Sequence, residues 1–412
     1  MTPLRYHLFQ AYGIELEYMI VDRDTLDVRP IADELLKQEA GSYTGDFQNG
    51  MITWSNELVL HVIELKSTRP EANISALENA FADNVRHINQ VLAGFNAMLM
   101  PTAAHPWMNP LEETRLWPHD NNEVYHIYNR IFDCRGHGWS NLQSTHLNLP
   151  FYDDEEFSKL HAAIRVLLPL LPALCASSPI LNGQPTGSLD TRLKYYKTNQ
   201  AKIPSITGRV IPEAVFSKRQ YFNTVYDKIR SDLAVYNDHE ILDPVWVNSR
   251  GAIPRFDRGS IEIRIMDIQE SPGADLAVQT LVIETIEALV NEQFIPMEDL
   301  VKVRTDSLAN ILDEVMVGGP HAVIQHAELL NVFDFKSPCT AGELWKTVLD
   351  RLIRKGYHSL EKWKPELDII LTEGTLSNRI LRSIPSSPSR EDLAKTYRRL
   401  SECLEQNKMF LP

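Results

Sequence analysis

The chain has 412 residues, of which 43% are apolar and 23% charged, and its formal net charge is −14. This composition is typical of a globular protein, excludes a largely disordered chain, and argues against non-specific nucleic-acid binding because the excess charge is acidic. At about 150 residues per domain, the length favours roughly two to three domains.

Strand-like and helix-like patterns alternate through the first 296 residues. Alternating or continuous apolar runs predict strands at 13–21, 57–66, 142–149, 245–247 and 260–267. Helical spacing predicts a helix at 75–99, opened by a Ser75-x-x-Glu78 capping box, one at 157–175 interrupted by two prolines, and one at 275–293.

Beyond Pro296 the strand patterns stop. Helices are predicted at 297–316, at 341–355 after a Thr340-x-x-Glu343 box, and at 390–407. We therefore expect an α+β catalytic body over residues 1–296 and a helical C-terminal region over 297–412.

The first candidate residues are Glu15 and Glu17, in the predicted strand Gly13-Ile-Glu-Leu-Glu-Tyr. Alternate side chains of a strand share a face, so these carboxylates point the same way, about 7 Å apart, while the intervening aliphatic residues form a core face. Neighbouring carboxylates repel each other unless a cation or a proton lies between them. The alternative is an ordinary solvated sheet face.

A second acidic pair, Glu57 and Glu64, brackets the aliphatic run Leu58 to Ile63. A carboxylate in a buried strand is costly unless it is paired, protonated or bound to a metal ion. The odd spacing would send the two side chains to opposite faces of an unbroken strand, so a bulge or an early strand end is needed to bring both to one site. Glu57 could equally be a surface residue.

Two further strands carry polar residues on one face. Ser144, His146 and Asn148 alternate along one strand, where His146 could bind a metal ion or a phosphate, or could be an ordinary core histidine. Glu262 and Arg264 share a face of another strand, either as a structural ion pair or as a metal ligand beside a phosphate-binding guanidinium.

Two loops and one strand end add three candidates. Arg192 follows a stretch rich in turn-forming residues, and Arg250 ends the alternating segment Val245-Trp-Val-Asn-Ser-Arg. Asp267 falls on the isoleucine side of its predicted strand, where it could orient a neighbour. The common phosphate-binding glycine motifs and the G-x-S-x-G and H-E-x-x-H hydrolase motifs are absent.

Together these residues predict phosphoryl-transfer chemistry. Hard oxygen ligands suit Mg²⁺, with Mn²⁺ as an alternative, and arginines suit a transferring phosphoryl group. We therefore expect an enzyme that uses ATP without a P-loop.

The location of the protein is predicted from what the sequence lacks. There is no run of about 18 apolar residues, and the segment from Met1 to His7 lacks the apolar core of a signal peptide. The four cysteines are far apart and form no C-x-x-C pair, so we expect neither a zinc site nor a disulfide framework. A cytoplasmic protein with no membrane partner is expected.

An ordered set of motifs resembles glutamate–cysteine ligase family 2, also called the carboxylate–amine ligases, within the glutamine synthetase-like superfamily. The motifs are G-I-E-L-E at 13–17, E-x6-E at 57–64, A-H-P at 104–106, Q-S-T-H at 143–146, A-S-S-P at 176–179 and G-S-I-E-I-R-x-M-D at 259–267. The resemblance covers about residues 7–290. Some relatives carry H-x-H where this chain has Ser144-x-His146.

The resemblance implies a glutamine synthetase-like body with a curved, mainly antiparallel sheet flanked by helices. It implies Mg²⁺ ligands among the residues Glu15, Glu17, Glu57, Glu64, His146 and Glu262. It also implies nucleotide or phosphate contacts from Ser144, His146, Asn148 and Arg264. Arg264 would hold the γ-phosphoryl group, and Arg192 and Arg250 would hold phosphate or a substrate carboxylate.

The implied reaction is ATP-dependent formation of an amide between glutamate, or a related acid, and cysteine or another amine through a γ-glutamyl phosphate. The alternatives are the same chemistry on a different acid and amine, a metal-dependent hydrolase that needs no ATP, or a catalytically silent homologue that binds nucleotide and metal. We expect small-molecule substrates, allow for a homo-oligomer, and leave the role of the C-terminal helices open.

Overall fold

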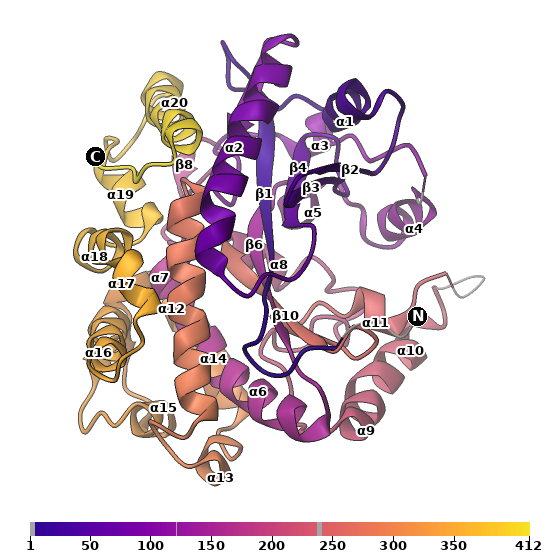
Figure 1. Ribbon diagram of the computed structural model, residues 1–412. Helices are drawn as coiled ribbons and strands as arrows, with labels where there is room; N and C mark the ends of the chain where they lie inside the picture. Colours follow the sequence, from indigo (N-terminus) through magenta and orange to yellow (C-terminus); the bar gives the residue numbers. More distant parts are fainter. Residues whose placement is uncertain (1–4, 121, 237–240) are drawn as a thin grey trace.

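The fold is organised around an eight-stranded sheet, seen in a computed structural model that describes residues 5–120, 122–236 and 241–412 (Figure 1). All of its strand pairings are antiparallel, in the order β2-β3-β4-β1-β6-β10-β9, with β5 also paired to β1. The strands are β1 (Gly13–Asp22), β2 (Asp46–Asn49), β3 (Ile52–Asn56), β4 (Val62–Ser67), β5 (Ala97–Met100), β6 (Ser144–Pro150), β9 (Ala252–Arg255) and β10 (Ser260–Asp267). The predicted α+β class with a mainly antiparallel sheet is confirmed.

Strand β1 lies in the middle of the sheet and has two different faces. One edge pairs with β4, and the other pairs first with β6 and then with β5. Ile14, Leu16 and Tyr18 are completely buried on one face, as the alternating pattern predicts. Glu15 and Glu17 therefore lie on the opposite face.

Two long helices, α2 (Ile74–Ala93) and α12 (Pro272–Val290), pack against each other and lie over the sheet (Figure 1). In α12 only Glu284 and Glu287 are not buried, so this helix is a central element of the core. The predicted capping box at the start of α2 is wrong, because the side chain of Asn73 caps the helix by accepting a hydrogen bond from the Ser75 N–H. The predicted extension to residue 99 is also wrong, since 97–100 form β5.

Shorter helices cover the rest of the body. The predicted helix 157–175 is broken by its prolines into α6 (Asp154–Leu167), a 3₁₀ turn (Leu168–Leu170) and α7 (Pro172–Cys175). The remaining elements are α1 (Ala32–Ala40), α3 (Pro110–Glu113), α4 (Asn122–Phe132), α5 (His137–Ser140), α8 (Thr191–Tyr196), α9 (Lys218–Tyr221), a π-helical turn (Phe222–Tyr226), α10 (Asp227–Leu233), α11 (Pro244–Val247) and the short pair β7 (Ile180–Leu181) and β8 (Gln184–Pro185).

Two strand predictions need correction. The segment 245–247 is helical, because Pro244 occupies the first helical position of α11 and the side chain of Asp243 caps it. The segment 57–66 is extended only from Val62 onward, so Glu57 lies in the preceding loop. Both errors came from apolar runs too short to distinguish a strand from a turn of helix or an ordered loop.

The C-terminal region is largely helical and forms a column along one side of the body (Figure 1). The column packs on α12, α7 and β5, and its buried side chains belong to the same two apolar clusters as those of the body. Its elements are α13 (Met297–Leu300), α14 (Thr305–Gly318), a 3₁₀ turn (Gly319–His321), α15 (Ala327–Val332), α16 (Ala341–Arg354), α17 (Ser359–Lys362), α18 (Lys364–Glu373), α19 (Leu376–Arg382) and α20 (Arg390–Gln406). The division at residue 296 remains a proposal about chain organisation.

Two details of this region bear on the sequence predictions. The capping box of Thr340 and Glu343 is present at the start of α16. A short antiparallel pair, β11 (Val323–Ile324) and β12 (Cys339–Thr340), interrupts a region predicted to contain helices only. No helix among the described residues has the length and the apolar character that crossing a membrane would require.

Candidate active site

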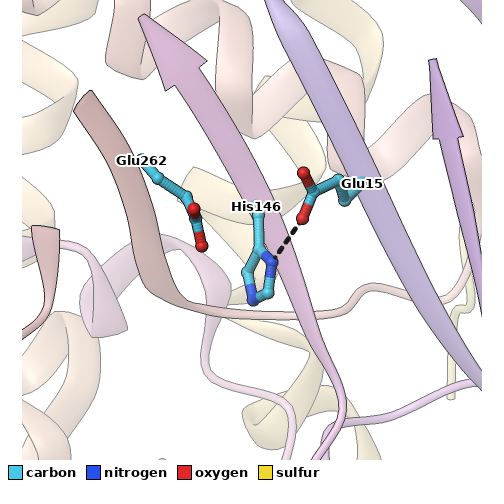
Figure 2. Close-up of side chains that lie close together, drawn as sticks. All are labelled: Glu15, His146 and Glu262. Atoms are coloured by element: carbon cyan, nitrogen blue, oxygen red, sulfur yellow. Dashed lines mark hydrogen bonds and ion pairs between the residues drawn. The ribbon is translucent and has the colours of Figure 1, made fainter. Parts of the chain in front are cut away.

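Acidic side chains from separate strands converge on one face of the sheet, the face of β1 that carries Glu15 and Glu17. The strand register pairs Glu15 with His146 and Glu17 with Glu64, and it pairs Glu262 with Asn148. Directly opposed residues of antiparallel strands share a face, so these groups lie side by side. Figure 2 shows Glu15, His146 and Glu262 pointing from neighbouring strands toward one another.

Hydrogen bonds hold His146 and its neighbours in place. The Nδ1 atom of His146 lies 2.8 Å from a carboxylate oxygen of Glu15, and Nε2 lies 2.9 Å from the Ser144 hydroxyl. The Ser144 hydroxyl and backbone N–H both donate to one oxygen of Glu17, at 3.0 and 2.6 Å. The Asn148 amide donates to Glu15 at 3.2 Å. All three predicted polar residues of this strand therefore contact the acidic pair.

The charge on Glu15 and His146 is mutually stabilised. Burial by itself would raise the pKa of Glu15, but the hydrogen bond and charge of His146 lower that pKa to about 2. For His146, burial would lower the pKa, and the hydrogen bond that its Nδ1–H donates to Glu15, together with the charge of Glu17, raises it. In the absence of a bound cation, the imidazolium form of His146 supplies part of the positive charge that the carboxylates require.

The pKa values of Glu57 and Glu64 are raised, whereas that of Glu15 is lowered. Burial, followed by the charge of Glu15, raises the pKa of Glu64 to about 8. Burial and the charges of Glu17 and Glu64 raise the pKa of Glu57 well above its usual value. Strand β4 starts only at Val62, so Glu57 does not belong to the strand that carries Glu64. The interruption of the strand that their odd spacing required is therefore present, and Glu57 is not forced to the opposite face.

Three side chains could hold a metal ion together. Glu15, His146 and Glu262 each offer a ligand atom, and these atoms all lie within 4.8 Å of one another. Two carboxylates and one imidazole suit a hard divalent cation such as Mg²⁺ or Mn²⁺. The raised pKa values of neighbouring Glu57 and Glu64 mean that protons occupy positions where a cation would also be favourable.

Two arginines flank Glu262. The Arg255 Nε–H donates to Glu262 Oε2 at 3.1 Å. Arg264 Nε lies 3.0 Å from Glu262 Oε1, an ion pair by distance, but its N–H finds no hydrogen-bond acceptor among the described residues. The charge of Arg264 is therefore balanced by Glu262, but its Nε–H lacks a hydrogen-bond acceptor in the part of the chain that the structure describes. This leaves the guanidinium available to an anion.

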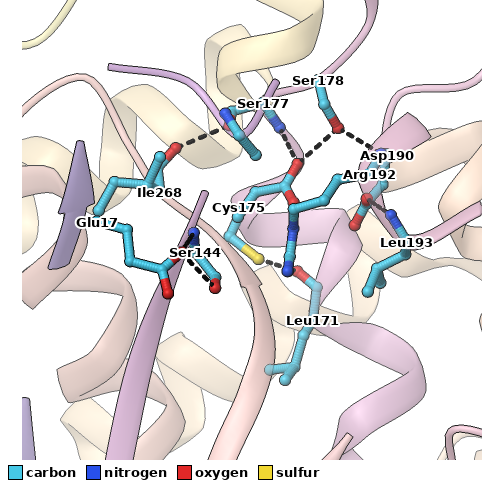
Figure 3. A network of polar contacts seen from close by, with 12 residues as sticks. Glu17, Ser144, Leu171, Cys175, Ser177, Ser178, Asp190, Arg192, Leu193 and Ile268 are labelled. Carbon is cyan, nitrogen blue, oxygen red and sulfur yellow. Dashed lines mark hydrogen bonds and ion pairs between the residues drawn. The ribbon is translucent and has the colours of Figure 1, made fainter. Parts of the chain in front are cut away.

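Arg192 is held by Asp267 on the same face of the sheet. Its Nε–H donates to Asp267 Oδ1 at 2.5 Å, while Ser177 and Ser178 donate to the other oxygen of Asp267. Figure 3 shows Arg192, Ser177 and Ser178 within this network of polar contacts. The side chain of Arg192 is 2% exposed, and its Nη2 has no acceptor within the described part of the chain. A buried guanidinium donor without an acceptor is costly, so this atom is a candidate contact for a substrate anion.

A register shift explains how Asp267 reaches Arg192. The pairing of β10 with β6 shifts between Ile263 and Met266, so Asp267 lies opposite Ser144 rather than one position further along. This bulge moves Asp267 from the predicted isoleucine side to the face that carries Ser144. The sequence prediction placed Asp267 on the wrong face because a bulge cannot be seen in the alternation of residues.

Arg250 is placed apart from this group. Its guanidinium donates to both oxygens of Glu213 at 2.6 Å and to Asn248 at 2.9 Å. It does not line the cavities described below, and its ion pair anchors the loop before β9 to the segment around Glu213.

Two cavities meet the acidic group from opposite ends of the strands. The first cavity, of about 290 Å³, is lined by Glu17, Glu57, His146, Arg192 and Arg264 among others. The second cavity, of about 240 Å³, is lined by Glu15 and Asn148. Its cationic residues are Lys66, Arg69 and Arg258. The carboxylates thus separate two spaces, each with its own positive charges.

Several lining residues were not predicted from the sequence. Arg255 carries no motif, although its place just before the β9–β10 turn and its hydrogen bond to Glu262 mark it as part of the site. Aromatic side chains form much of the first cavity's wall, and only the helical turns around them bring them together. These are Tyr125, Tyr128, Trp139, Tyr196 and Trp246.

Comparison with known proteins identifies similar chains. Residues 11–399 match the sequence profile of glutamate–cysteine ligase family 2. An uncharacterized protein of Archaeoglobus fulgidus is 33% identical over 406 residues, covering 97% of this chain and all of that protein. A putative glutamate–cysteine ligase 2 of Ruegeria pomeroyi is 26% identical over 263 residues, covering 62% of this chain and 60% of that protein's length.

Solved structures share the fold at low sequence identity. The glutamate–cysteine ligase of Francisella tularensis, determined in complex with AMP, superposes with a TM-score of 0.60 at 12% identity, covering 98% of this chain and 90% of that one. A bifunctional glutathione synthetase from Pasteurella multocida has a TM-score of 0.62 at 14% identity, covering 97% of this chain and 53% of that one. These likenesses concern the fold.

Proposed function

The chain belongs to glutamate–cysteine ligase family 2, and from that premise we propose that it joins glutamate, or a closely related acid, to an amine through a γ-glutamyl phosphate. The enzyme class predicted from the sequence, an ATP-dependent ligase that forms a carbon–nitrogen bond, is that of the family. The identity of the acid, the amine and the intermediate belong to the proposal.

The observation that carries the proposal is the gathering of acidic residues from separate strands around one histidine, between two cavities. Glu15, Glu64 and Glu262 come from three different strands and share one face. A protein gains nothing in stability from crowding like charges, so their placement is best explained by cations that they hold. A plain surface cluster would not have arginine side chains lining the cavities at both of its ends.

The acidic residues are proposed to hold Mg²⁺. Glu15, His146 and Glu262 would form one site. Glu17, Glu57 and Glu64, whose charges raise the pKa of Glu57, would form a second. When bound, the metal ions would offset the charge of the triphosphate and the developing charge of the transferred phosphoryl group. His146 would serve as a ligand through Nε2 when its Nδ1–H donates to Glu15, and Nε2 would then give up its contact with the Ser144 hydroxyl.

The two cavities suggest a division of substrates. We assign the nucleotide to the second cavity, where the cations Lys66, Arg69 and Arg258 suit a triphosphate. The acid then lies in the first cavity, with a carboxylate on the free Nη2 of Arg192. Its reacting carboxylate would lie near Arg264, which lines the same cavity.

The bonds that form and break follow from this arrangement. An oxygen of the acid's side-chain carboxylate attacks the γ-phosphorus of ATP, the bond to the bridging oxygen breaks, and ADP leaves with that electron pair. The amine nitrogen then attacks the acyl carbon, the carbon–oxygen bond to phosphate breaks, and the nitrogen loses a proton. Arg264 stabilises negative charge on the phosphoryl oxygens, and Arg192 fixes the acid, which makes the reaction largely a matter of positioning.

The proposal is tested by amine-dependent ADP release with a panel of acids and amines. Glu17→Gln and Arg264→Ala should each abolish the activity while the melting temperature and circular dichroism stay close to those of the parent. The matched controls are Glu112→Gln and Arg86→Ala, which change an exposed and a half-buried residue outside the cavities. Full activity in both site variants would refute the residue assignment, and ADP binding without turnover for every pair tested would favour a silent homologue.

A further inference from the structure

A third cavity, of about 500 Å³, adjoins the proposed active site and has no part in the function so far. It shares the side chains of Trp246 and Arg255 with the first cavity. It also shares Arg258 with the second cavity. Its occupant would therefore lie next to the reacting substrates rather than on a remote surface.

The third cavity carries an excess of positive charge. Its ionisable lining residues are the cations Arg5, Lys218, Arg255 and Arg258 and the carboxylates Asp243 and Asp257. Arg258 lies 3.9 Å from Asp257, and its side chain is 70% exposed, so this ion pair is loose. Lys218 forms no ion pair with the residues that the structure describes, and its ammonium lies 5.7 Å from the ring centroids of Phe222 and Phe256.

The wall between the first and third cavities is an exposed tryptophan. Trp246 is 53% exposed, which is unusual for the largest apolar side chain. It lies in the short helix α11, whose start is capped by the side chain of Asp243. An indole in this position offers a flat apolar surface to a ligand that extends from one cavity into the other.

The order of substrate entry indicates which substrate reaches the third cavity, and this step rests on the proposed function. Arg192 lies deep in the first cavity, so the acid that it holds occupies the inner end. The amine reacts only after the acyl phosphate has formed and must enter from the open end, past Trp246. Any part of the amine beyond its reacting nitrogen would then point toward the third cavity.

We propose that the amine substrate is elongated and carries a distal carboxylate or phosphate, which the third cavity binds through Lys218 and Arg258 while the middle of the molecule packs on Trp246. The substrate class is therefore a peptide-like or otherwise extended anionic amine. A single small amino acid would fill the first cavity and leave the third without a ligand.

Binding of matched peptides to the full chain tests this inference. The probes are tripeptides X-Gly-Gly with the first residue varied and the same peptides with a C-terminal carboxamide, added with Mg²⁺ and ADP and measured by thermal shift and then calorimetry. The free-acid form of the best binder should bind about five-fold more tightly than its amide, the preference that a part-exposed ion pair supplies. Equal binding of both forms, or no binding by any free acid, would overturn the proposal.

Variants distinguish whether the third cavity binds the carboxylate of the peptide or the phosphates of the nucleotide. Lys218→Gln and Arg258→Gln should remove the preference for the free acid, with little change in ADP affinity for Lys218→Gln. The matched control is Lys336→Gln, which changes an exposed lysine in the C-terminal region. If Lys218→Gln instead weakens ADP binding and leaves the peptide preference intact, nucleotide phosphates occupy the cavity and the proposal is wrong.

The two proposals can fail separately. Peptide binding needs no turnover, so a preference for the free acid without ADP release by any amine would leave the third cavity standing and refute the ligase activity. ADP release at full rate with short neutral amines, together with equal binding of the free-acid and amide peptides, would support the ligase activity and refute the third-cavity proposal.

Discussion

Asp267 and Arg192 form an ion pair that is almost completely buried and lies directly beneath the proposed active site. The side chains are 0% and 2% exposed, and the Arg192 Nε–H donates to Asp267 at 2.5 Å. Asp267 also accepts hydrogen bonds from Ser177 and Ser178, so its carboxylate is fixed from several directions. The pair turns the unpaired Nη2 of Arg192 into a rigid donor at the inner end of the first cavity.

Replacing Asp267 with asparagine should impair acid binding more than nucleotide binding. Without the carboxylate, Arg192 loses its orientation, and a displaced contact of this kind costs about ten- to a hundred-fold in kcat/KM. The KM for the acid should rise while the KM for ATP stays nearly constant. Ser178→Ala is the control, because it removes one bond to Asp267 and leaves the ion pair intact. Equal rises in both KM values would indicate general unfolding of the site instead.

Replacing His146 should weaken divalent-metal binding. Asparagine at this position removes the imidazole between Glu15 and Glu262, and we expect at least about a ten-fold loss of Mg²⁺ affinity, measured by calorimetric titration. Ser144→Ala should cause a smaller loss, because it removes the hydroxyl that contacts Glu17 and the ring but leaves the imidazole in place. His358→Asn, at an exposed histidine, is the control. Unchanged Mg²⁺ affinity in His146→Asn would exclude the histidine as a ligand.

The metal-free protein should lose stability as the pH rises. The pKa of Glu64 is raised from 4.5 to about 8, so the folded state retains a proton that the unfolded state releases within this range. Its stabilising contribution is therefore complete below about 4.5 and disappears as the pH approaches 8. The melting temperature in EDTA should fall across this window, and Mg²⁺ should reduce the fall because it replaces the proton. In Glu64→Gln the pH dependence should become shallower.

Disrupting the buried pair of Arg379 and Glu270 should strongly destabilise the protein. Both side chains are completely buried, and Arg379 also donates to the Phe410 carbonyl, which ties the end of α19 to the last residues of the chain. Arg379→Met leaves Glu270 as an uncompensated buried charge, at a cost of about 3–5 kcal/mol in the free energy of unfolding. The double variant with Glu270→Met should recover part of this loss. Urea denaturation measures both, and a loss in the single variant below about 1 kcal/mol would contradict the expectation.

A side chain at Gly13 should disturb the second cavity only. A Cβ at this position would lie 3.1 Å from the Cβ of Asn148, which donates to Glu15. Gly13→Ala should therefore push Asn148 away and raise the KM for ATP several-fold, with little change in the KM for the acid. Gly50→Ala is a control for stability alone, because Gly50 has open space around it and only its positive φ would strain an alanine. A rise confined to the KM for the acid would reverse the assignment of the two cavities.

Local patterns were sufficient for the strands that carry most of the acidic residues. The alternation around Glu15 and Glu17 is confirmed because both faces of β1 are specified by side-chain chemistry. The strands around His146 and Glu262 were located for the same reason. The capping box at Thr340 was equally visible, since it depends only on residues three positions apart.

Features that depend on distant contacts were missed. The bulge that turns Asp267 toward Arg192 arises from pairing with β6, and it leaves no mark in the alternation of β10. Arg250 resembled a ligand-binding residue by spacing, but its position is determined by Glu213, 37 residues earlier in the chain. The aromatic wall of the first cavity and the exposed position of Trp246 likewise depend on how helices and loops pack around the sheet.

The amino-acid sequence by itself determined the chemical groups, their order and the strand face on which Glu15, Glu17 and His146 stand, because strand geometry has a period of two residues and acts locally. Only the tertiary structure decided which groups meet, since strand register, one bulge and the packing of the helices set distances between residues that are far apart in the sequence. For that reason Glu15 and His146 could be named from the sequence, while the pairing of Arg192 with Asp267 and the third cavity could be found only in the folded chain.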